Sequence, residues 1–320
     1  VHAWGIPYIA TMLGLKQVYP GRYDPELLVG LWQKEQVTFS HCVPTILQMV
    51  LNAKAAQGVD FKGWKLIIGG SALNRSLFLN ARERGMHLST AYGMSETGPI
   101  ISGAYLNDGD LAGSEDQRTA SLLKAGVPVP LVQARIIDAE GKSLPHDGHA
   151  QGELVLRAPW LTMAYFNEPQ KSAELWEGGW LHTGDVAAIG TGGAIEIRDR
   201  IKDVIKTGGE WISSLELEDL ISRHPAVREV AVVGIADERW GEAPFALIVL
   251  RDGQTLDAAG LQAHMMPFVE QGRINKWGIP RSIALVNEVP KTSVGKLDKK
   301  VIRLQIAQWK AEGSSVISSL

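Results

Sequence analysis

The sequence predicts an α/β protein with a layered α/β domain, a β-rich subdomain and a small α+β domain at the end. Three observations lead to this fold class. Short apolar runs that end in glycine alternate with helical repeats in residues 1–100, strand-like alternation dominates residues 126–199, and helical and strand patterns mix in residues 205–320. The length of 320 residues suggests two domains, and 45% hydrophobic with 21% charged residues is typical of a globular protein.

The layered domain is predicted from a strand–helix–strand pattern. Lys65–Ser71 is an apolar run that contains two glycines near its end, and His87–Tyr92 is a second run followed directly by glycine. Between them, Leu77, Phe78 and Ala81 recur at helical spacing. Glycines at strand ends indicate a layered sheet, in which ligands bind at the carboxyl ends of the strands.

The β-rich subdomain is predicted from alternating segments in residues 126–199. Val132–Asp138 and Gly152–Arg157 alternate as strands do, and Val186–Ile189 and Ala194–Ile197 flank the glycine-rich turn Gly190–Gly193. The last pair therefore predicts a β-hairpin.

The small domain is predicted to begin after the charged segment Asp199–Asp203, so that the domains comprise residues 1–199 and 205–320. Ser213–Glu216 is a capping box that opens a helix. Strands are expected at Val230–Ile235 and Phe245–Leu250, and a terminal helix at Val301–Trp309.

Composition limits the class of partner and compartment. The 32 basic and 35 acidic residues give a net charge of −3 without a block of one sign, which argues against a nucleic-acid partner. Cys42 is the only cysteine, so an intrachain disulfide framework is excluded and a reducing, cytoplasmic location is expected. The uncharged stretch Val1–Leu15 is shorter than the roughly 18 residues of a membrane span.

A first candidate segment, Tyr92–Pro99, places an aromatic ring, two hydroxyls and a carboxylate between glycines just after a strand. The ring can stack on a base, the hydroxyls can bind phosphate oxygens, and Glu96 can hold Mg²⁺, which prefers oxygen ligands. The alternative is a tight turn whose Ser and Thr cap the next helix.

A second candidate segment, Gly178–Asp185, ends in an aspartate that follows Thr-Gly at the expected mouth of the hairpin. Asp185 can accept two hydrogen bonds from a ribose diol. The alternative is a turn aspartate that bonds to its own backbone.

A third candidate segment, Asp199–Trp211, carries Arg200, Lys202 and Lys206 before the glycine pair Gly208–Gly209. The cations can meet phosphates, and the glycines allow a ligand to approach the backbone. The alternative is a solvated charged linker between domains.

A fourth candidate segment, Pro290–Asp298, places Lys296 after a glycine in a polar loop. A mobile lysine can neutralise a carboxylate and a phosphate that are forced together. The alternative is a basic surface loop, because Lys299 and Lys300 follow immediately.

Together, in this order and spacing, the four segments resemble the adenylate-forming superfamily, which includes acyl-CoA synthetases, peptide-synthetase adenylation domains and beetle luciferases. Val1–Tyr8 and Gly208–Ser214 are most similar to bacterial medium- and long-chain fatty acyl-CoA synthetases. The resemblance implies a fatty acid–CoA ligase that uses ATP, Mg²⁺ and coenzyme A, with an acyl-adenylate as intermediate. It also implies a large domain followed by a mobile small domain.

In the large domain, the resemblance implies that Tyr92 stacks on adenine, Ser95 bonds to phosphate, Glu96 binds Mg²⁺ and Asp185 holds the ribose. Trp4 matches a gating tryptophan at the fatty-acyl tunnel. The residues implied to help Tyr92 around the adenine are Gly70, Ser71, Ala72, Thr90 and Ala91.

In the rest of the chain, Arg200 is implied to hold the ribose with Asp185, and Lys202 lies at the hinge, residues 200–204. Lys206 is implied to contact the nucleotide, and Lys296 is the implied adenylation lysine. The loop that is implied to meet CoA comprises Gly208, Gly209, Glu210 and Trp211.

The chain departs from the superfamily because no Ser/Thr/Gly-rich loop ending in Pro-Lys-Gly occurs in it. We therefore expect it to be the C-terminal portion of an enzyme and to be inactive in adenylation by itself. A CoA ligase for a short polar or aryl acid, a carrier-loading adenylation domain and a non-catalytic nucleotide-binding fragment stay open as alternatives. A hydrolase centred on Ser71 is remote, since no triad accompanies it. A homodimer and a peripheral membrane contact also stay open.

Overall fold

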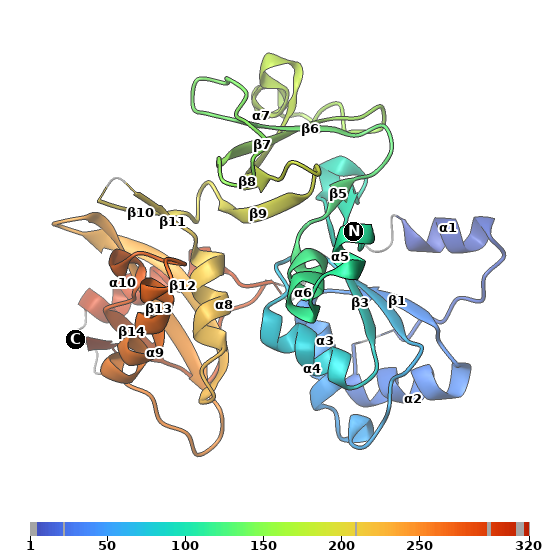
Figure 1. Cartoon of the computed structure of the whole chain (residues 1–320), viewed down its shortest axis with the longest axis horizontal. Helices are drawn as coiled ribbons and strands as arrows, with labels where there is room; N and C mark the ends of the chain where they lie inside the picture. Colours follow the sequence, from blue (N-terminus) through green and yellow to red (C-terminus); the bar gives the residue numbers. More distant parts are fainter. Residues whose placement is uncertain (1–4, 22, 209, 293–295, 312–316, 320) are drawn as a thin grey trace. The chain divides into compact units, whose positions relative to one another are not determined.

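The computed structural model divides the chain into two compact units, residues 1–197 (unit 1) and residues 198–320 (unit 2). It describes the whole chain except residues 1–4, 22, 209, 293–295, 312–316 and 320. Figure 1 shows how the elements of each unit are arranged. No helix among the described residues combines the length and the apolar character that are needed to cross a bilayer.

Unit 1 begins with a five-stranded sheet in the order β1-β2-β3-β4-β5. The strands are β1 (Phe39–Cys42), β2 (Lys65–Ile68), β3 (His87–Tyr92), β4 (Ser102–Gly103) and β5 (Val127–Pro128). The first three are parallel, and the last two pairings are antiparallel. The predicted strands at residues 65–71 and 87–92 are therefore confirmed as neighbouring parallel strands.

Helices pack on this sheet (Figure 1), and buried side chains of helices and strands together form its core. In α4 (Arg75–Glu83), Leu77, Phe78 and Ala81 are the buried residues, as the helical spacing predicts. Asn74 caps the helix by accepting a 2.8 Å hydrogen bond from the Leu77 N–H. The helices of this part are α1 (Ile6–Met12), α2 (Pro25–Glu35), α3 (Pro44–Asn52), α4 (Arg75–Glu83), α5 (Asp108–Ala112) and α6 (Glu115–Leu123).

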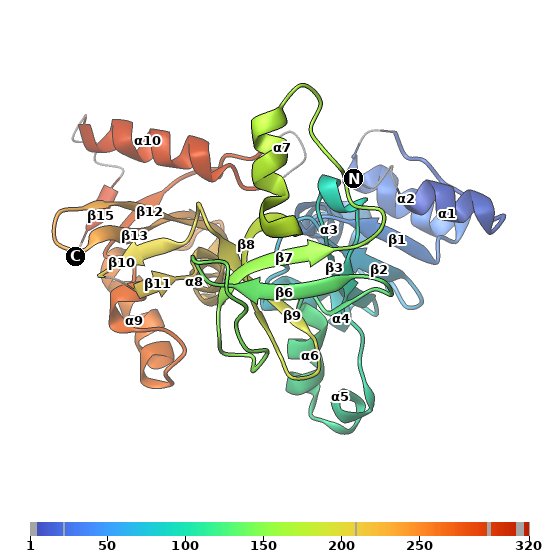
Figure 2. The same cartoon turned by 90° about the horizontal axis from the view of Figure 1, so that it is seen from above.

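The β-rich part of unit 1 is a four-stranded sheet in the order β6-β7-β8-β9, with β6, β7 and β8 antiparallel (Figure 2). The strands are β6 (Gln133–Ile137), β7 (Gly152–Arg157), β8 (Leu181–Ile189) and β9 (Ile195–Arg200), and α7 (Pro169–Leu175) precedes β8. The predicted hairpin joins β8 and β9: the Gly190 N–H donates to the Ala194 carbonyl at 3.0 Å.

Unit 2 is a six-stranded sheet with helices on both faces. The strand order is β11-β10-β13-β14-β15, and β12 pairs with β13. The strands are β10 (Ile205–Thr207), β11 (Glu210–Ile212), β12 (Val227–Asp237), β13 (Gly241–Leu250), β14 (Ser282–Leu285) and β15 (Ile317–Ser319). The helices are α8 (Ser214–Ser222), α9 (Ala258–Glu270) and α10 (Lys299–Ala311). Ser213 caps α8 through a 3.1 Å hydrogen bond that its hydroxyl accepts from the Glu216 N–H, which is the forward half of the predicted capping box.

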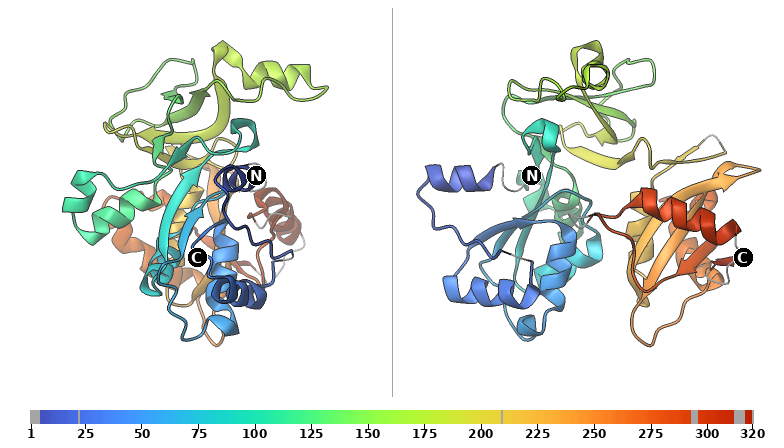
Figure 3. Two further views of the ribbon diagram at one scale, coloured as in Figure 1. Left: turned by 90° about the vertical axis from the view of Figure 1, so that its right-hand side faces the viewer. Right: turned by 180° about the vertical axis from the view of Figure 1, so that it is seen from behind.

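The two faces of this sheet carry separate hydrophobic layers because successive strand residues point to opposite sides. Val230 and Val232 belong to the layer that includes residues of α8 and α9, whereas Ala231 and Val233 belong to the layer that includes α10. Figures 2 and 3 show α10 on one side of the sheet and α9 on the other. The apolar runs at residues 230–235 and 245–250 are thus buried on both faces.

Candidate functional site

The carboxyl ends of β2 and β3 lie side by side, which brings two candidate segments together. Ile68 pairs with Thr90 in the parallel ladder, and a Cβ added at Gly69 would lie only 3.0 Å from the Ala91 carbonyl oxygen. Gly70 has φ 84°, a left-handed conformation that favours glycine. The chain therefore turns beside Ala91 and exposes Ser71 and Ala72 there.

Thr90 lies at the same edge, but its hydroxyl is engaged within the protein. It is buried and donates to the Leu122 carbonyl at 3.0 Å, with the Lys124 carbonyl also in contact. The Thr90 side chain thus links the end of β3 to the end of α6 by hydrogen bonds.

Tyr92, the last residue of β3, is joined to Asp185 in the β-rich part of the unit. The Tyr92 hydroxyl donates a hydrogen bond to Oδ2 of Asp185, across 93 positions of sequence. Asp185 is only 5% exposed. An aromatic ring and a nearly buried carboxylate are therefore brought to one place from two sheets.

Asp185 does not lie at the mouth of the hairpin, as the sequence suggested, because β8 already begins at Leu181. Instead it belongs to a β-bulge. Glu153 of β7 pairs with Val186 and Val155 pairs with His182, so the three residues 153–155 on β7 oppose the five residues 182–186 on β8. Bulges re-aim side chains and occur next to active sites.

The bulge is held by side chains of its own strand and of β7. Thr183 Oγ1 donates to the Leu154 carbonyl at 2.7 Å and accepts from the Asp185 N–H at 3.1 Å. Glu153 Oε1 accepts from the Gly184 N–H at 3.0 Å, and its Oε2 lies 2.9 Å from Nδ1 of His182. Gly184 within an otherwise strand-like run is the signal from which the sequence could have predicted the bulge.

Ser95 and Glu96 lie in a short 3₁₀ turn, Ser95–Thr97, after β3. Thr97 Oγ1 accepts a 2.9 Å hydrogen bond from the Met94 N–H, so the capping role considered for this segment is present. The exposed Ser95 and the carboxylate of Glu96 belong to the same turn.

A segment that the sequence analysis did not single out holds this turn. The Tyr165 hydroxyl donates to Oε1 of Glu96 at 2.8 Å, the Thr162 N–H donates to the Glu96 carbonyl at 2.9 Å, and Trp160 Nε1 donates to the Thr97 carbonyl at 3.1 Å. Burial and the adjacent Glu96 carboxylate raise the pKa of Tyr165 to about 12, so it stays a donor at neutral pH.

The donor chemistry at Glu96 fits a magnesium ion that is held mainly by substrate. Among the described residues, no group of three or more His, Cys, Asp or Glu side chains could hold a metal ion by itself. Mg²⁺ is usually bound by one or two carboxylates with phosphates and waters. Tyr165 occupies one acceptor position of Glu96, and a carboxylate offers about four.

The remaining described candidates lie in unit 2. Arg200 ends β9, and its N–H donates to Oδ1 of Asp199 at 2.7 Å. The Lys202 side chain is exposed, and its carbonyl accepts from Arg303 at 3.3 Å.

The β10–β11 hairpin presents the next group of candidates. Lys206 pairs with Trp211 across the hairpin, and its Nζ lies 5.9 Å from the centre of the Trp211 ring. The Trp211 side chain is 53% exposed. The Gly208 N–H donates to the Trp240 carbonyl at 2.9 Å, and Glu210 accepts from the Asn275 amide. Gly209, like Trp4, lies outside the described residues.

Lys296 is placed by a paired loop base. Its N–H donates to Thr292 Oγ1 at 3.2 Å, and the Thr292 N–H donates to the Lys296 carbonyl at 2.8 Å. Lys291 and Leu297 form a β-bridge just outside this pair. Residues 293–295, which include the glycine before Lys296, lie outside the described residues.

Comparison with known proteins assigns the family. Residues 1–166 match the AMP-binding enzyme family, and residues 216–296 match the C-terminal domain of AMP-binding enzymes. The chain belongs to the AMP-binding enzyme family. The predicted resemblance is thereby confirmed, and the layered α/β fold is that of adenylate-forming enzymes.

Two curated relatives and one solved structure illustrate the AMP-binding family. A long-chain-fatty-acid–CoA ligase of Thermus thermophilus is 39% identical over 312 residues, which is 97% of this chain and 57% of that protein. A 3-methylmercaptopropionyl-CoA ligase of Ruegeria pomeroyi is 36% identical over 95% of this chain and 56% of that protein. An anthranilate CoA ligase in complex with anthranoyl-AMP superposes with a TM-score of 0.77 at 26% identity, over 91% of this chain and 55% of the other. The chain thus spans about half the length of the curated relatives it matches.

Proposed function

We propose that the protein carrying this chain is an ATP-dependent acid–thiol ligase. It joins a carboxylic acid to coenzyme A through an acyl-adenylate and releases AMP and diphosphate. The observation that carries the proposal is the meeting of Tyr92 and Asp185 at the carboxyl end of β3, in a chain of the AMP-binding family. A reducing, cytoplasmic setting is proposed with it, since Cys42 is the only thiol.

Tyr92 and Asp185 supply the chemistry that a nucleoside requires. The Tyr92 ring offers a flat face on which adenine stacks, beside the chain turn at Gly70, and the Asp185 carboxylate accepts hydrogen bonds from the ribose hydroxyls. The Tyr92 hydroxyl donates to Oδ2 of Asp185, so the ring that we assign to the base and the carboxylate that we assign to the ribose are in contact. We assign Arg200 to the same ribose and Ser95 to a phosphate oxygen.

Glu96 is the residue we propose to hold Mg²⁺, with Tyr165 fixing the carboxylate that does so. The ion, when bound, neutralises charge on the phosphates of ATP. Lys296 adds a second positive charge. Two anions, the carboxylate and the α-phosphate, must approach each other in the first step, so charge neutralisation and positioning are the main needs.

The second step needs a surface for coenzyme A rather than another catalytic side chain, because the CoA thiol is itself the nucleophile. We assign this surface to Gly208, Gly209, Glu210 and Trp211. We assign Lys206, on the same hairpin, to a contact with the nucleotide. Trp211 is exposed and lies on a short hairpin, where a ring can be reached by a ligand. We further propose that Lys202 is the hinge at which the small domain turns between the two steps.

A fatty acid is our proposed acyl substrate, supported by the long-chain-fatty-acid–CoA ligase among the relatives. With it we propose that Trp4 gates the acyl tunnel. A short polar or aryl acid is the second candidate. It is favoured by two other similar proteins, whose names refer to 3-methylmercaptopropionate and anthranilate.

The test is AMP release by the full-length protein with ATP, Mg²⁺ and straight-chain acids of increasing length, with and without CoA. 3-Methylmercaptopropionate and anthranilate are included in the series. CoA-dependent AMP release that peaks at medium or long chains supports the fatty-acid proposal. Turnover confined to the polar or aryl acid contradicts the fatty-acid proposal but leaves the proposed reaction in place. No AMP from any acid, with AMP still bound, favours a non-catalytic nucleotide-binding protein.

A matched pair of lysine variants tests the role of Lys296. Lys296→Ala should lower acyl-adenylate formation by about 10²–10³ while sparing thioester formation from supplied acyl-adenylate. Lys300→Ala removes an exposed charge from the first turn of α10 and should leave both half-reactions unchanged. Equal loss of both half-reactions in Lys296→Ala contradicts the assignment. The 320-residue chain alone, which lacks the Pro-Lys-Gly loop, should release no diphosphate.

A further inference from the structure

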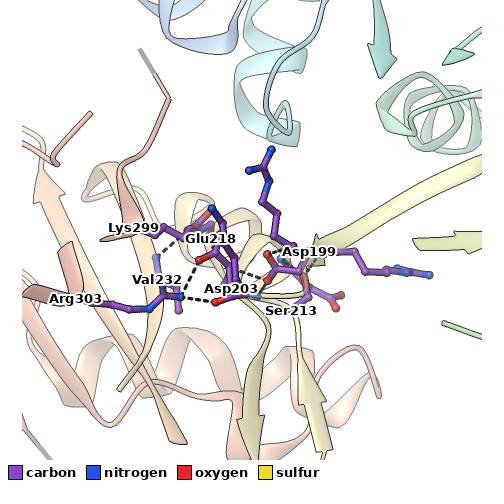
Figure 4. Close-up of polar contacts among 12 residues, drawn as sticks. Asp199, Asp203, Ser213, Glu218, Val232, Lys299 and Arg303 are labelled. Carbon is purple, nitrogen blue, oxygen red and sulfur yellow. Dashed lines mark hydrogen bonds and ion pairs between the residues drawn. The ribbon is translucent and has the colours of Figure 1, made fainter. Parts of the chain in front are cut away.

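A chain of buried polar contacts runs through unit 2 from Lys299 to Asp199 (Figure 4). Lys299 Nζ donates to Ser214 Oγ at 2.5 Å, and Ser214 Oγ donates to Oδ2 of Asp199 at 2.6 Å. Lys299 Nζ also lies 2.8 Å from Oε1 of Glu218, which accepts from the Val232 N–H at 2.9 Å. We call Asp199, Ser214, Glu218 and Lys299 the Lys299 network.

Three of the four residues of the network are buried and the Glu218 side chain is 13% exposed, although they come from segments with a strongly charged sequence. Asp199 is 1% exposed and Lys299 is 9% exposed, and Ser214 is fully buried. Burial raises the pKa of the Glu218 carboxyl, and the charge of Lys299 opposes that rise. Buried charges are unfavourable unless they are paired. The positive charge of Lys299 therefore offsets the desolvation cost of the Asp199 and Glu218 carboxylates.

Asp199 connects the network to the backbone of Arg200. Its Oδ2 accepts from the Ser214 N–H at 2.6 Å at the start of α8, and its Oδ1 accepts from the Arg200 N–H at 2.7 Å. A carboxylate at a helix N-terminus is favourably placed against the helix dipole. Asp199 therefore fixes the chain at the point from which the Arg200 side chain projects.

A second anchor holds the other end of the same short segment. Arg303 of α10 pairs with Oδ1 of Asp203 at 2.8 Å and donates to the Lys202 carbonyl at 3.3 Å. The Asp203 N–H in turn donates to the Arg200 carbonyl at 2.8 Å. Residues 199–203 are thus tied to α8 and α10 at both ends, rather than forming a solvated linker.

We propose that Lys299 is a positioning residue for Arg200, acting through Ser214 and Asp199. The inference rests on the proposed function in one respect, namely that Arg200 contacts the nucleotide. Lys300 is the natural control, because it is the next residue of the same helix turn, carries the same charge and is exposed.

The first test needs no ligand and measures amide hydrogen exchange in the peptide that spans residues 199–204. Lys299→Met should raise exchange there about fivefold or more, since a hydrogen bond to a charged group is lost from the network. Lys300→Met should leave exchange unchanged, and Lys299→Arg should restore part of the protection. Unchanged exchange in folded Lys299→Met overturns the proposal.

A second variant keeps the test decisive if Lys299→Met fails to fold. Ser214→Ala removes the hydroxyl between Lys299 and Asp199 but keeps the Lys299–Glu218 pair and the bond from the residue 214 N–H. It should also raise exchange in residues 199–204. Normal exchange in Ser214→Ala would show that the segment is held without Lys299 and would overturn the proposal.

The second test measures AMP affinity by calorimetry in Arg200→Ala, Lys299→Met and the double variant. Lys299→Met should weaken binding about threefold to tenfold, and the double variant should be no weaker than Arg200→Ala, because both changes remove one function. Additive losses, or normal affinity in Lys299→Met beside a weakened Arg200→Ala, overturn the proposal. If Arg200→Ala binds AMP normally, the proposed role of Arg200 fails instead, and the exchange measurements still judge whether Lys299 holds residues 199–203.

Discussion

Tyr165 donates a 2.8 Å hydrogen bond to the carboxylate of Glu96, although 69 positions separate the two residues in the sequence. The bond ties a long connecting segment of the β-rich part to the short turn after β3. Thr162 and Trp160 donate hydrogen bonds to backbone carbonyls of the same turn, whereas Tyr165 donates to the side-chain carboxylate itself.

Tyr165→Phe should raise the Mg²⁺ concentration needed for half-maximal adenylation about threefold to tenfold. The ring and its packing remain, and only the hydrogen bond that orients Glu96 is lost. Mg²⁺ titrations of the full-length protein at saturating ATP measure this. Tyr105→Phe, at a tyrosine that is 64% exposed, is the matched control and should not shift the titration. An unaltered Mg²⁺ requirement in Tyr165→Phe would separate Tyr165 from the metal.

Asp185→Asn should weaken AMP binding about tenfold to a hundredfold, because hydrogen bonds from the ribose to a charged acceptor are lost. Tyr92→Phe keeps the ring and should cost much less than Tyr92→Ala, which removes a stacking surface worth about 1–3 kcal/mol. Calorimetric titration with AMP ranks the three variants. Equal losses in Tyr92→Phe and Tyr92→Ala would argue that the hydroxyl, and not the ring, serves the nucleotide.

Cys42, the only cysteine, should react slowly with a disulfide reagent in the folded protein. Burial raises its pKa to about 12, so at pH 8 its thiolate fraction is about 10³-fold below that of an exposed thiol. Reaction rates before and after unfolding in urea measure this, and a native rate close to the unfolded one would refute it. Since the folded-state pKa lies above the unfolded value, the thiol favours folding at neutral pH, and this contribution is lost as the pH rises from about 9 towards 12.

Gly93→Ala should destabilise unit 1 by about 3 kcal/mol or more, because the added Cβ would lie 1.8 Å from the Pro99 carbonyl oxygen and backbone must move. Gly192→Ala is the control, since nothing lies within 4 Å of its Cβ position. Urea unfolding followed by tryptophan fluorescence compares the two. Equal stability of both variants would show that the turn after β3 relaxes readily.

Local pattern was enough to predict the elements whose partners are close in sequence. The buried face of α4 follows from Leu77, Phe78 and Ala81, and the β8–β9 hairpin follows from its glycine turn, because both depend on periodicity and turn chemistry. The residues implied by family resemblance could also be named, but their roles cannot be read from position alone.

Long-range and buried polar contacts could not be predicted in the same way. Tyr165 carries no local sign that it meets Glu96, and Asp199 lies in a charged run that usually indicates solvent exposure. Asp185 is expected at the mouth of the hairpin but lies within β8. Gly184 signals an irregular strand, whereas the bond to Glu153 of β7 that fixes the bulge leaves no local sign in the sequence. Such contacts are fixed by tertiary packing, which overrides the local pattern.

Because both faces of β12 and β13 are buried, the pattern of polar and apolar residues does not fix the register in which these two strands pair. A slip of one residue in a half-exposed strand would send polar side chains into the core, but here it would exchange one set of apolar side chains for another. Alignment must therefore come from the turn between the strands. Asp237 Oδ1 accepts from the Arg239 and Trp240 N–H groups at 3.0 and 2.9 Å, and Gly241 follows with φ 80°. This small loop therefore sets the register of β12 against β13, and with it which side chains enter each of the two hydrophobic layers.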